Sequence, residues 1–351
     1  MALLKITSPH AHGPMTTDQV MRLVLLATVP GILALTLHFG FGTLVNIFWA
    51  AQIALGCEVL ALKLRKRKIG FYLNDCSALV TAVLLGIALP PASPLWLIAV
   101  GVAFSILIAK HLYGGMGYNP FNPAMVGYVV LLISFPVEMT TWLAPEGSFD
   151  GSVLGILDAI IASLIGLDTP SIDAFTTATT LDIFKQNNSL LVADLWSQSS
   201  QFGRWGGRGW EWANIGFLIG GLFLLQRKVF TWHAPLSMLL SLSVLAILFY
   251  DNGSSASAGS PLMHLLSGAT MFGAFFIITD PVTSAVSNRG RVIYGAAIGV
   301  LIFLIRTWGN YPDAVAFAVL IMNFAAPFID HYTQPRTYGH KKNDSNSKGE
   351  K

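Results

Sequence analysis

Long apolar stretches alternate along the chain with short polar connections, and this pattern predicts transmembrane helices. A helix needs about 20 predominantly apolar residues to cross the hydrocarbon core of a bilayer. The segments that meet or approach this length are 20–40, 43–62, 76–92, 94–112, 124–143, 211–226, 233–250, 261–279, 292–308 and 313–330. We therefore predict an all-α integral membrane protein with about ten transmembrane helices.

Two further features qualify this pattern. The segment 152–166 is apolar but short and contains Asp158, so we expect it to be interfacial or packed on the protein rather than to span. Ten spans divide as five plus five, and an odd number in each half would make a duplication an inverted repeat. The two halves show no convincing match in sequence, so the repeat rests on the count alone.

Composition supports a membrane protein. The 351 residues are 54% hydrophobic and 11% charged, whereas soluble domains carry about 25% charged residues. The net charge of +3 is small and scattered, which argues against a nucleic-acid partner. An iron–sulfur cluster needs about four thiolates, so Cys57 and Cys76 are expected to be packing residues, and we expect no metal site.

The distribution of basic residues predicts the orientation of the chain. Cytoplasmic loops of membrane proteins are enriched in Lys and Arg. With the N-terminus in the cytoplasm, the inner segments collect Arg65, Lys66, Arg67, Lys68, Lys110, Arg227, Lys228, Arg289, Arg291 and the basic tail. Of the 21 Lys and Arg residues, those outside or near the outer face are Lys185, Arg204, Arg208 and Arg306. Both termini are therefore predicted to be cytoplasmic.

We interpret residues 1–351 as one polytopic membrane domain with three extramembrane parts. Residues 1–19 form a cytoplasmic N-terminal segment without the apolar core of a cleavable signal. Residues 331–351 form a basic cytoplasmic tail. Residues 144–210 form a long periplasmic loop, and loops of this length are usually functional or disordered. This loop contains four large aromatic residues, so we expect it to pack: Trp196, Phe202, Trp205 and Trp210.

Five acidic residues lie within or at the ends of apolar segments, and burial of an ionised carboxylate there costs several kcal/mol. They are Glu58, Asp75, Asp280, Asp313 and Asp330. Asp75, Asp313 and Asp330 could equally lie among lipid headgroups or cap helices. Asp280 is followed by Pro281 in a polar cluster, and broken helices with carboxylates form ion sites in transporters. We predict an ion path along these acids.

Two loops stand out by their composition. The loop from Tyr113 to Pro123 contains three glycines, which permit close backbone approach to a ligand or simply a turn between two helices. The segment from Asp173 to Asp182 contains four threonines in five residues, and taken alone it suggests only a threonine-rich turn.

Several ordered motifs resemble a known family. They are the stretch 267–284 (SGATMFGAFFIITDPVTS), 288–291 (NRGR), 89–96 (LPPASPLW), 119–124 (NPFNPA) and 311–313 (YPD). These motifs resemble the D subunit of the Rnf ion-translocating electron-transport complex, and also its relative, the B subunit of the sodium-translocating NADH:quinone reductase. The resemblance covers nearly the whole chain. The short N-terminal extension fits the Rnf branch better.

The resemblance implies a flavin mononucleotide joined by a phosphoester to a threonine of an outer loop. The family's attachment motif is Asp-x-x-(Ser/Thr)-x-Ala-Thr, which Asp173, Thr176, Ala178 and Thr179 match, so Thr179 would carry the flavin. Thr177 replaces the usual glycine, and a shift of one residue would select Thr180 instead.

A second sequence, Ser267-Gly268-Ala269-Thr270, spells the motif more literally. Thr270, however, is predicted to lie about two turns inside the eighth apolar segment, where a flavin transferase acting from the outer side could not reach it. We therefore favour Thr179.

The implied function is that of a flavin-carrying membrane subunit, not catalytic alone, in a bacterial inner-membrane complex that couples electron transfer from NADH or ferredoxin to ion translocation. The resemblance implies the A, B, C, E and G subunits of Rnf, membrane lipid and a flavin transferase as partners, and a further non-covalent riboflavin. The loop from Gly203 to Trp210 could cover the flavin and bind its phosphate, or anchor the chain at the membrane surface. The alternatives are a secondary transporter or channel with no redox role, and a structural scaffold. Sodium and proton sites both use carboxylates, so the sequence leaves the ion open.

Overall fold

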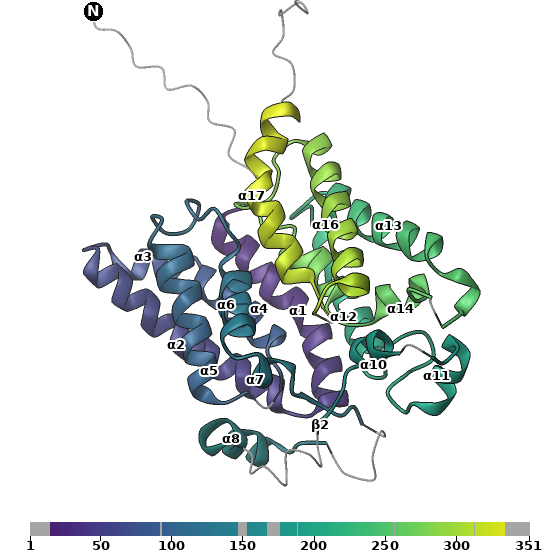
Figure 1. Cartoon of the computed structure of the whole chain (residues 1–351). Coiled ribbons are helices and arrows are strands. Elements are labelled where there is room, and N and C mark those ends of the chain that lie inside the picture. The colour runs from purple at the N-terminus through teal and green to yellow at the C-terminus, as the bar shows by residue number, and fades with distance from the viewer. Residues whose placement is uncertain are drawn as a thin grey trace, which may run out of the picture.

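The computed structural model describes residues 15–91, 93–146, 153–166, 176–187, 189–255, 257–311 and 313–333. Helices dominate this part of the chain (Figure 1). In the first half they are α1 (Thr17–Phe39), α2 (Gly42–Leu64), α3 (Ile69–Leu73), α4 (Ser77–Ala88), α5 (Leu95–Ala103), η1 (Phe104–His111), α6 (Pro123–Ser134), α7 (Pro136–Thr140) and α8 (Ile156–Ile165). In the second half they are α10 (Thr180–Gln186), α11 (Val192–Gln198), α12 (Trp210–Gln226), α13 (His233–Leu248), η2 (Asp251–Gly253), α14 (Pro261–Leu266), α15 (Thr270–Phe272), η3 (Gly273–Ile277), α16 (Asn288–Trp308) and α17 (Val315–Thr333).

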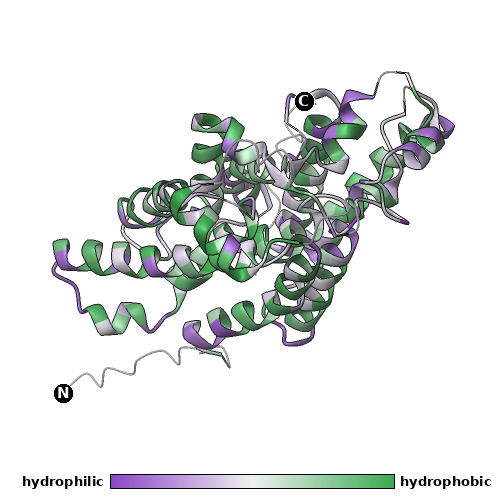
Figure 2. Ribbon diagram, turned by 90° about the horizontal axis from the view of Figure 1, so that it is seen from below, coloured by the Kyte–Doolittle hydropathy of each residue, from purple (hydrophilic) through white to green (hydrophobic). Residues whose placement is uncertain are grey.

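The prediction of a helical membrane protein is confirmed at this level. Among the described residues, four helices are long and apolar enough to cross a membrane: α1, α2, α16 and α17. The other predicted spans coincide with shorter helices or pairs of helices. Exposed apolar side chains such as Leu33 on α1 and Phe324 on α17 point away from the bundle, and apolar residues colour most of the helices in Figure 2. An outward-facing apolar surface is what a bilayer requires.

Two predicted spans are interrupted. Segment 124–143 was expected to form one helix, but α6 ends at Ser134 and α7 begins at Pro136. Proline lacks the backbone N–H that would continue the helix and restricts the residue before it. Segment 261–279 was also expected to be continuous, but it breaks between α14 and α15, where Gly268 has φ +61°. A Cβ at Gly268 would lie 2.6 Å from an Asp313 carboxylate oxygen, so the break needs glycine.

Small residues bring helix pairs into close contact. Gly216 and Gly220 of α12 lie directly against backbone carbonyls of α1, those of Pro30 and Ala27. Gly299 of α16 lies in the same way against α13. Close packing at small residues is how membrane helices associate without a hydrophobic driving force. Pro30 lies inside α1, near the middle of the helix.

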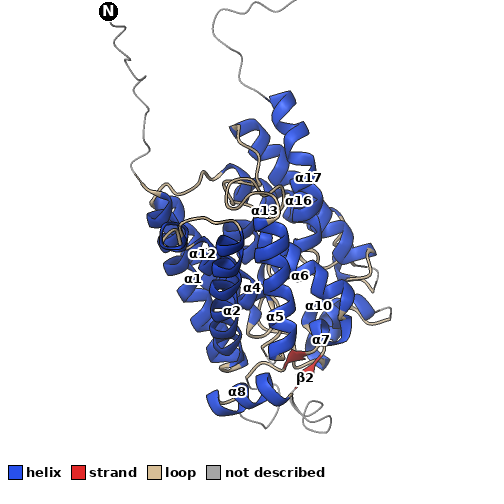
Figure 3. Cartoon of the chain, turned by 90° about the vertical axis from the view of Figure 1, so that its left-hand side faces the viewer, coloured by secondary structure: helices blue, strands red, loops and turns tan. Residues whose placement is uncertain are grey.

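The segment from Ala144 to Trp210 forms a packed cap at one end of the bundle, as far as the structure describes it. This segment contributes α8, α10 and α11. A short antiparallel pair of strands joins the residues just before the segment, β1 (Trp142–Leu143), to its middle, β2 (Thr176–Thr177). Figure 3 shows the strands at this end, beside α7 and α10. Trp142 pairs with Thr177, so the strands fix the threonine-rich segment next to the end of α7.

Candidate functional site: the pocket beside Thr179

Thr179 begins helix α10 and is held by Asp182. The Thr179 hydroxyl donates to the Asp182 carboxylate at 2.5 Å, and the Thr179 backbone N–H donates to the same carboxylate at 3.1 Å. The Asp182 backbone N–H donates back to the Thr179 hydroxyl oxygen at 3.3 Å. This reciprocal arrangement is a capping box. The Thr179 side chain is half-buried, so its hydroxyl is fixed in position yet reachable.

The two rival threonines are buried and engaged. Thr180 is 3% exposed, and its hydroxyl donates to the Gln201 carbonyl at 3.0 Å. Thr270 is 0% exposed, and its hydroxyl donates to the His264 carbonyl at 2.7 Å and accepts from Arg306 at 3.0 Å. Thr270 therefore lies at a helix break rather than inside a continuous helix as predicted, but its hydroxyl is inaccessible in either case.

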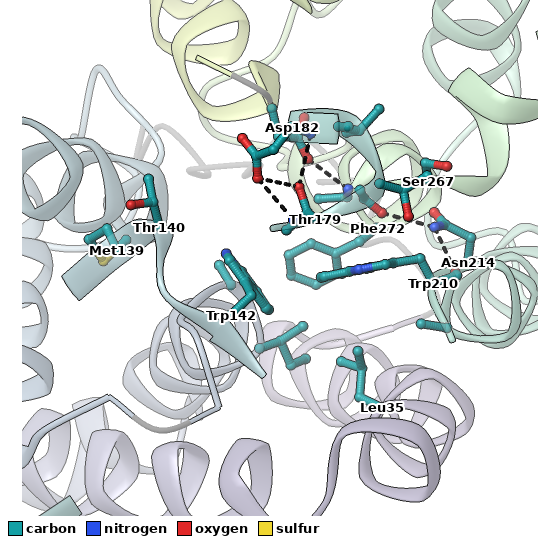
Figure 4. A pocket seen from close by; sticks show the side chains of 18 of the residues that line it. Leu35, Met139, Thr140, Trp142, Thr179, Asp182, Trp210, Asn214, Ser267 and Phe272 are labelled. Carbon is teal, nitrogen blue, oxygen red and sulfur yellow. Dashed lines mark hydrogen bonds between the residues drawn. The ribbon is translucent and has the colours of Figure 1, made fainter. Parts of the chain in front are cut away.

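Thr179 and Asp182 line a pocket with largely aromatic and apolar walls (Figure 4). Its empty space, including the open mouth, is about 880 Å³. Trp142 and Trp210 pack edge to face, with ring centroids 4.9 Å apart. Phe217 and Phe272 form a second ring pair at 4.9 Å, between α12 and α15. A concave, apolar pocket with a few fixed polar groups is the usual form of a cofactor site.

The break between α14 and α15 forms another wall of the pocket, and Asn214 secures it. The Asn214 amide donates to the Gly268 carbonyl at 2.9 Å, and its side-chain oxygen accepts from the Met271 N–H at 2.9 Å. The Ser267 hydroxyl accepts from the Gly207 N–H at 2.9 Å. The literal copy of the attachment motif thus lines the same pocket as Thr179, and its backbone groups are satisfied by other elements.

Asp313 and Arg306 support this break from behind. Asp313 accepts the Ala269 N–H at 2.7 Å and pairs with the Arg306 guanidinium at 3.0 Å. Arg306 is buried and also donates to the His264 carbonyl at 2.8 Å. The Asp313 carboxylate therefore balances the guanidinium charge. Carbonyl groups that the break leaves without helical partners accept further hydrogen bonds from the guanidinium.

Arg208 lies close to the residues that lead into α10. With Trp210, it lines a small hollow whose other side is formed by residues 177–180. Its backbone N–H donates to the Gln201 carbonyl at 2.9 Å, which fixes its position beside α10. Arg204, in the same loop, is exposed and lies over the Trp205 ring at 5.2 Å. Of the two arginines, Arg208 is the one that lines this hollow, and its guanidinium donates to the Ser200 carbonyl at 3.5 Å.

Lys185 ties α10 to the far wall of the pocket. Its amine donates to the Tyr311 carbonyl at 2.9 Å, and Tyr311 lines the pocket. Burial lowers the pKa of Lys185, and the charge of Asp182 acts in the opposite direction.

A second cavity lies at the other end of α1. Its empty space is about 1220 Å³ including the part open to solvent, and it is lined by Val24 of α1, whereas Leu35 of α1 lines the first pocket. Leu35 follows Val24 by eleven residues, which corresponds to about 16 Å along the helix axis. Ser77, Lys110 and Asp280 also line this second cavity.

A buried chain of charged and polar groups runs beside the second cavity. Glu58 pairs with Lys110 and with His111, both at 2.9 Å. Lys110 also donates to the Ser77 hydroxyl at 2.8 Å, and Ser77 donates to Asp75 at 2.6 Å. Two of the five predicted acids thus belong to one network, since Ser77 and Lys110 link Asp75 to Glu58.

The remaining acids are dispersed. Asp280 accepts from the Thr283 hydroxyl at 2.7 Å and shares the second cavity with Lys110. Asp330 accepts the Val286 N–H at 2.9 Å and so fixes the loop before α16. Asp313 lies apart from both, at the first pocket. Of the attachment motif, Thr176 and Ala178 lie next to Thr179, and Asp173 falls outside the described residues.

Several residues of these sites were not singled out by sequence reasoning. Trp142 and Asn214 gave no signal, because they come from segments far apart in the sequence. Lys110 was counted among the inner basic residues, but the structure buries it in an ion pair. The signal was available, because a lysine and a glutamate each fall within an apolar segment and each then needs a partner of opposite charge.

Comparison with known proteins places the chain in a family. A model of the NQR2, RnfD, RnfE family matches residues 5–339. The chain is 59% identical to the D subunit of the ion-translocating oxidoreductase complex of Cellvibrio japonicus, over 97% of this chain and 96% of that protein. It is 56% identical to the protein of the same description from Pseudomonas aeruginosa, over 97% of each, and 52% identical to that of Alcanivorax borkumensis, over 98% of this chain and 99% of that protein. The chain belongs to the NQR2, RnfD, RnfE family.

Proposed function

We propose that this chain is the flavin-carrying membrane subunit of a complex that couples electron transfer to ion translocation, with flavin mononucleotide attached to the Thr179 hydroxyl through its phosphate. One observation carries the proposal. Thr179 is half-buried at an aromatic pocket, whereas the rival threonines, Thr180 and Thr270, are almost fully buried. The relatives named as parts of an ion-translocating oxidoreductase complex support the redox role.

The residues around the pocket fit an anchored flavin. Trp142, Trp210 and Phe272 offer apolar surface for a planar ring. Arg208 supplies a positive charge beside Thr179 for the phosphate. The Asp182 carboxylate accepts a hydrogen bond from the Thr179 hydroxyl, which orients the oxygen for attachment by a flavin transferase. The bound flavin supplies one- and two-electron transfer.

We place the pocket on the periplasmic face of the bacterial inner membrane, within a topology of ten spans and cytoplasmic termini. The ion path lies toward the second cavity, where Asp280, Lys110, Glu58 and Asp75 gather. The partners are the A, B, C, E and G subunits of Rnf, and a non-covalent riboflavin completes the cofactor set.

Flavin fluorescence after denaturing electrophoresis tests the attachment. We expect a fluorescent band at the mass of this chain when it is produced with its flavin transferase. Thr179→Ala should abolish the band, and Thr179→Ser should keep it because serine retains the hydroxyl. Thr270→Ala should leave the band at the level of the unchanged chain. A band that survives Thr179→Ala would show that the flavin is attached elsewhere.

A transporter or channel without redox chemistry is the second candidate. The buried pair of Lys110 and Glu58 beside a large cavity favours it, because ionisable residues within membrane proteins mark ion pathways. The same gel separates the two, since a chain of this second kind carries no covalent flavin under any expression condition.

A further inference from the structure

Helix α8 exposes an apolar face that the rest of the described chain leaves uncovered. Leu157 is 71% exposed and Ile165 is 83% exposed, with Ile161 and Leu164 beside them. The polar side chain exposed on this helix is Asp158, in its first turn. A helix packed on a soluble domain carries polar residues on the side away from the core. Water is therefore a poor environment for the outer side of α8.

The opposite face of α8 packs on α2, one of the membrane-length helices. Ala159 of α8 packs in one small core with Val45 of α2. The Trp49 indole N–H donates to the Ser163 hydroxyl at 3.1 Å. Trp49 is seven residues from the start of α2, about 10 Å along its axis. Helix α8 thus contacts the first two to three turns of α2. The axis of α8 runs across the end of the bundle (Figures 1 and 3).

Helix α2 exposes an apolar side chain next to its contact with α8. Phe48 of α2 is 56% exposed, and its ring meets the Trp49 ring edge-on at 5.2 Å. The Trp49 indole is hydrogen-bonded to α8. Since α2 is long and apolar enough to cross the membrane, its exposed apolar side chains face hydrocarbon. The same hydrocarbon is adjacent to the outer face of α8.

We propose that α8 lies along the membrane surface with Leu157, Ile161 and Leu164 inserted among the lipid acyl chains of that leaflet. Lipid fits this face better than a protein partner does, because protein interfaces are enriched in aromatic residues, Met and Arg, and this face carries only Leu and Ile. Asp158, at the edge of the face, reaches the headgroups. Amphipathic helices bind membranes in this way.

The insertion has a direct consequence for the first pocket. Ten residues separate the end of α8 at Ile165 from the start of β2 at Thr176. A lipid-anchored α8 therefore limits the distance between the membrane surface and the threonine-rich segment to the reach of this connection, whether or not Thr179 carries a flavin.

Site-directed spin labelling tests the insertion on the full chain, reconstituted in phosphatidylcholine liposomes with the proteins that copurify with it. Cys57 and Cys76 are first replaced by serine, and single labels are placed through Leu157→Cys or Leu164→Cys. Leu33→Cys on α1 is the lipid-facing control, and Ser197→Cys on α11 is the water-facing control. Collisions with oxygen report lipid, and collisions with a water-soluble nickel chelate report water.

We expect the oxygen-to-nickel ratio at Leu157→Cys and Leu164→Cys to resemble that at Leu33→Cys. A ratio like that at Ser197→Cys overturns the proposal in favour of water. Immobile labels that neither reagent reaches overturn it in favour of a covering protein. Quenching of a fluorophore at Ile161→Cys by lipids brominated on the acyl chain provides a second readout, and its absence would count against insertion even where one labelled variant folds poorly.

Discussion

Arg306 and Asp313 form an ion pair at 3.0 Å behind the helix break that lines the Thr179 pocket. Because Arg306 is buried, Arg306→Gln removes a guanidinium that satisfies Asp313, Thr270 and the His264 carbonyl. Breaking a buried pair on one side costs about 3–5 kcal/mol, and the partial exposure of Asp313 places the expected loss toward the lower value. We expect a clear fall in the thermal unfolding temperature in detergent and less flavin per chain. Unchanged flavin content would show that the pocket does not depend on this pair.

Gly268 provides a sharper test of the same break. Its φ is +61°, and a methyl group there would lie 2.6 Å from an Asp313 oxygen, so alanine has no room. We expect Gly268→Ala to lower flavin content and the unfolding temperature together. Gly56 is the matched control, because nothing lies within 4 Å of its Cβ position. Gly56→Ala, within α2, should be neutral or stabilising by up to about 1 kcal/mol. Equal effects of the two substitutions would contradict a specific role for the break.

Substitution of Arg208 and of Arg204 distinguishes a specific contact with the flavin phosphate from a general effect of positive charge in this loop. Both belong to one loop, but Arg208 lines the hollow beside Thr179 and Arg204 lies over Trp205. Arg208→Gln should reduce the fraction of chains that carry flavin about tenfold or more, because a charge-assisted contact to phosphate contributes about 1.5–3 kcal/mol. Arg204→Gln should leave that fraction unchanged. Fluorescence per chain on a denaturing gel measures both, and a loss in Arg204→Gln alone would reverse the assignment.

Glu58 and Lys110 should show strong coupling in a double-mutant cycle. Glu58→Gln leaves the buried Lys110 ammonium without its carboxylate and should cost about 3–5 kcal/mol. Lys110→Met leaves Glu58 with His111 alone and should cost about 3 kcal/mol. The double variant should recover much of that loss, because no unpaired charge is left apart from the nearby His111. Chemical or thermal unfolding in detergent supplies the four values. Additive losses would mean that the two side chains do not depend on each other.

The apolar segments were predictable because a bilayer demands long uninterrupted hydrophobicity, and helices occupy all of them. The break at Gly268 was not predictable, since Ser267, Ala269 and Thr270 are small residues that also suit a packed helix. The broken conformation depends on Asp313, which lies 44 residues beyond Ala269 and accepts the Ala269 N–H. Pairing between distant segments is not encoded in local pattern.

The candidate site also has parts that the sequence could predict and parts that depend on contacts between distant segments. Thr179 was selected by the attachment motif that the family resemblance implies, and the structure adds the burial of its rivals, Thr180 and Thr270. The aromatic walls come from β1, α12 and α15, which no local pattern brings together. The network from Asp75 to Glu58 depends on Lys110, 52 residues from its glutamate. The periodicity of one segment carries no information about which residues of another segment lie opposite.

Pro30 interrupts the backbone hydrogen bonding of α1 near the middle of the helix. Proline leaves the carbonyl four residues earlier without its helical hydrogen bond, and Pro30 falls between Val24 at one cavity and Leu35 at the other. Each half of the helix borders one cavity, and Gly216 of α12 packs against the Pro30 carbonyl between them. Helix α1 therefore lacks a backbone hydrogen bond at a point between the two cavities that it borders, which is where a bend would cost the fewest helical hydrogen bonds.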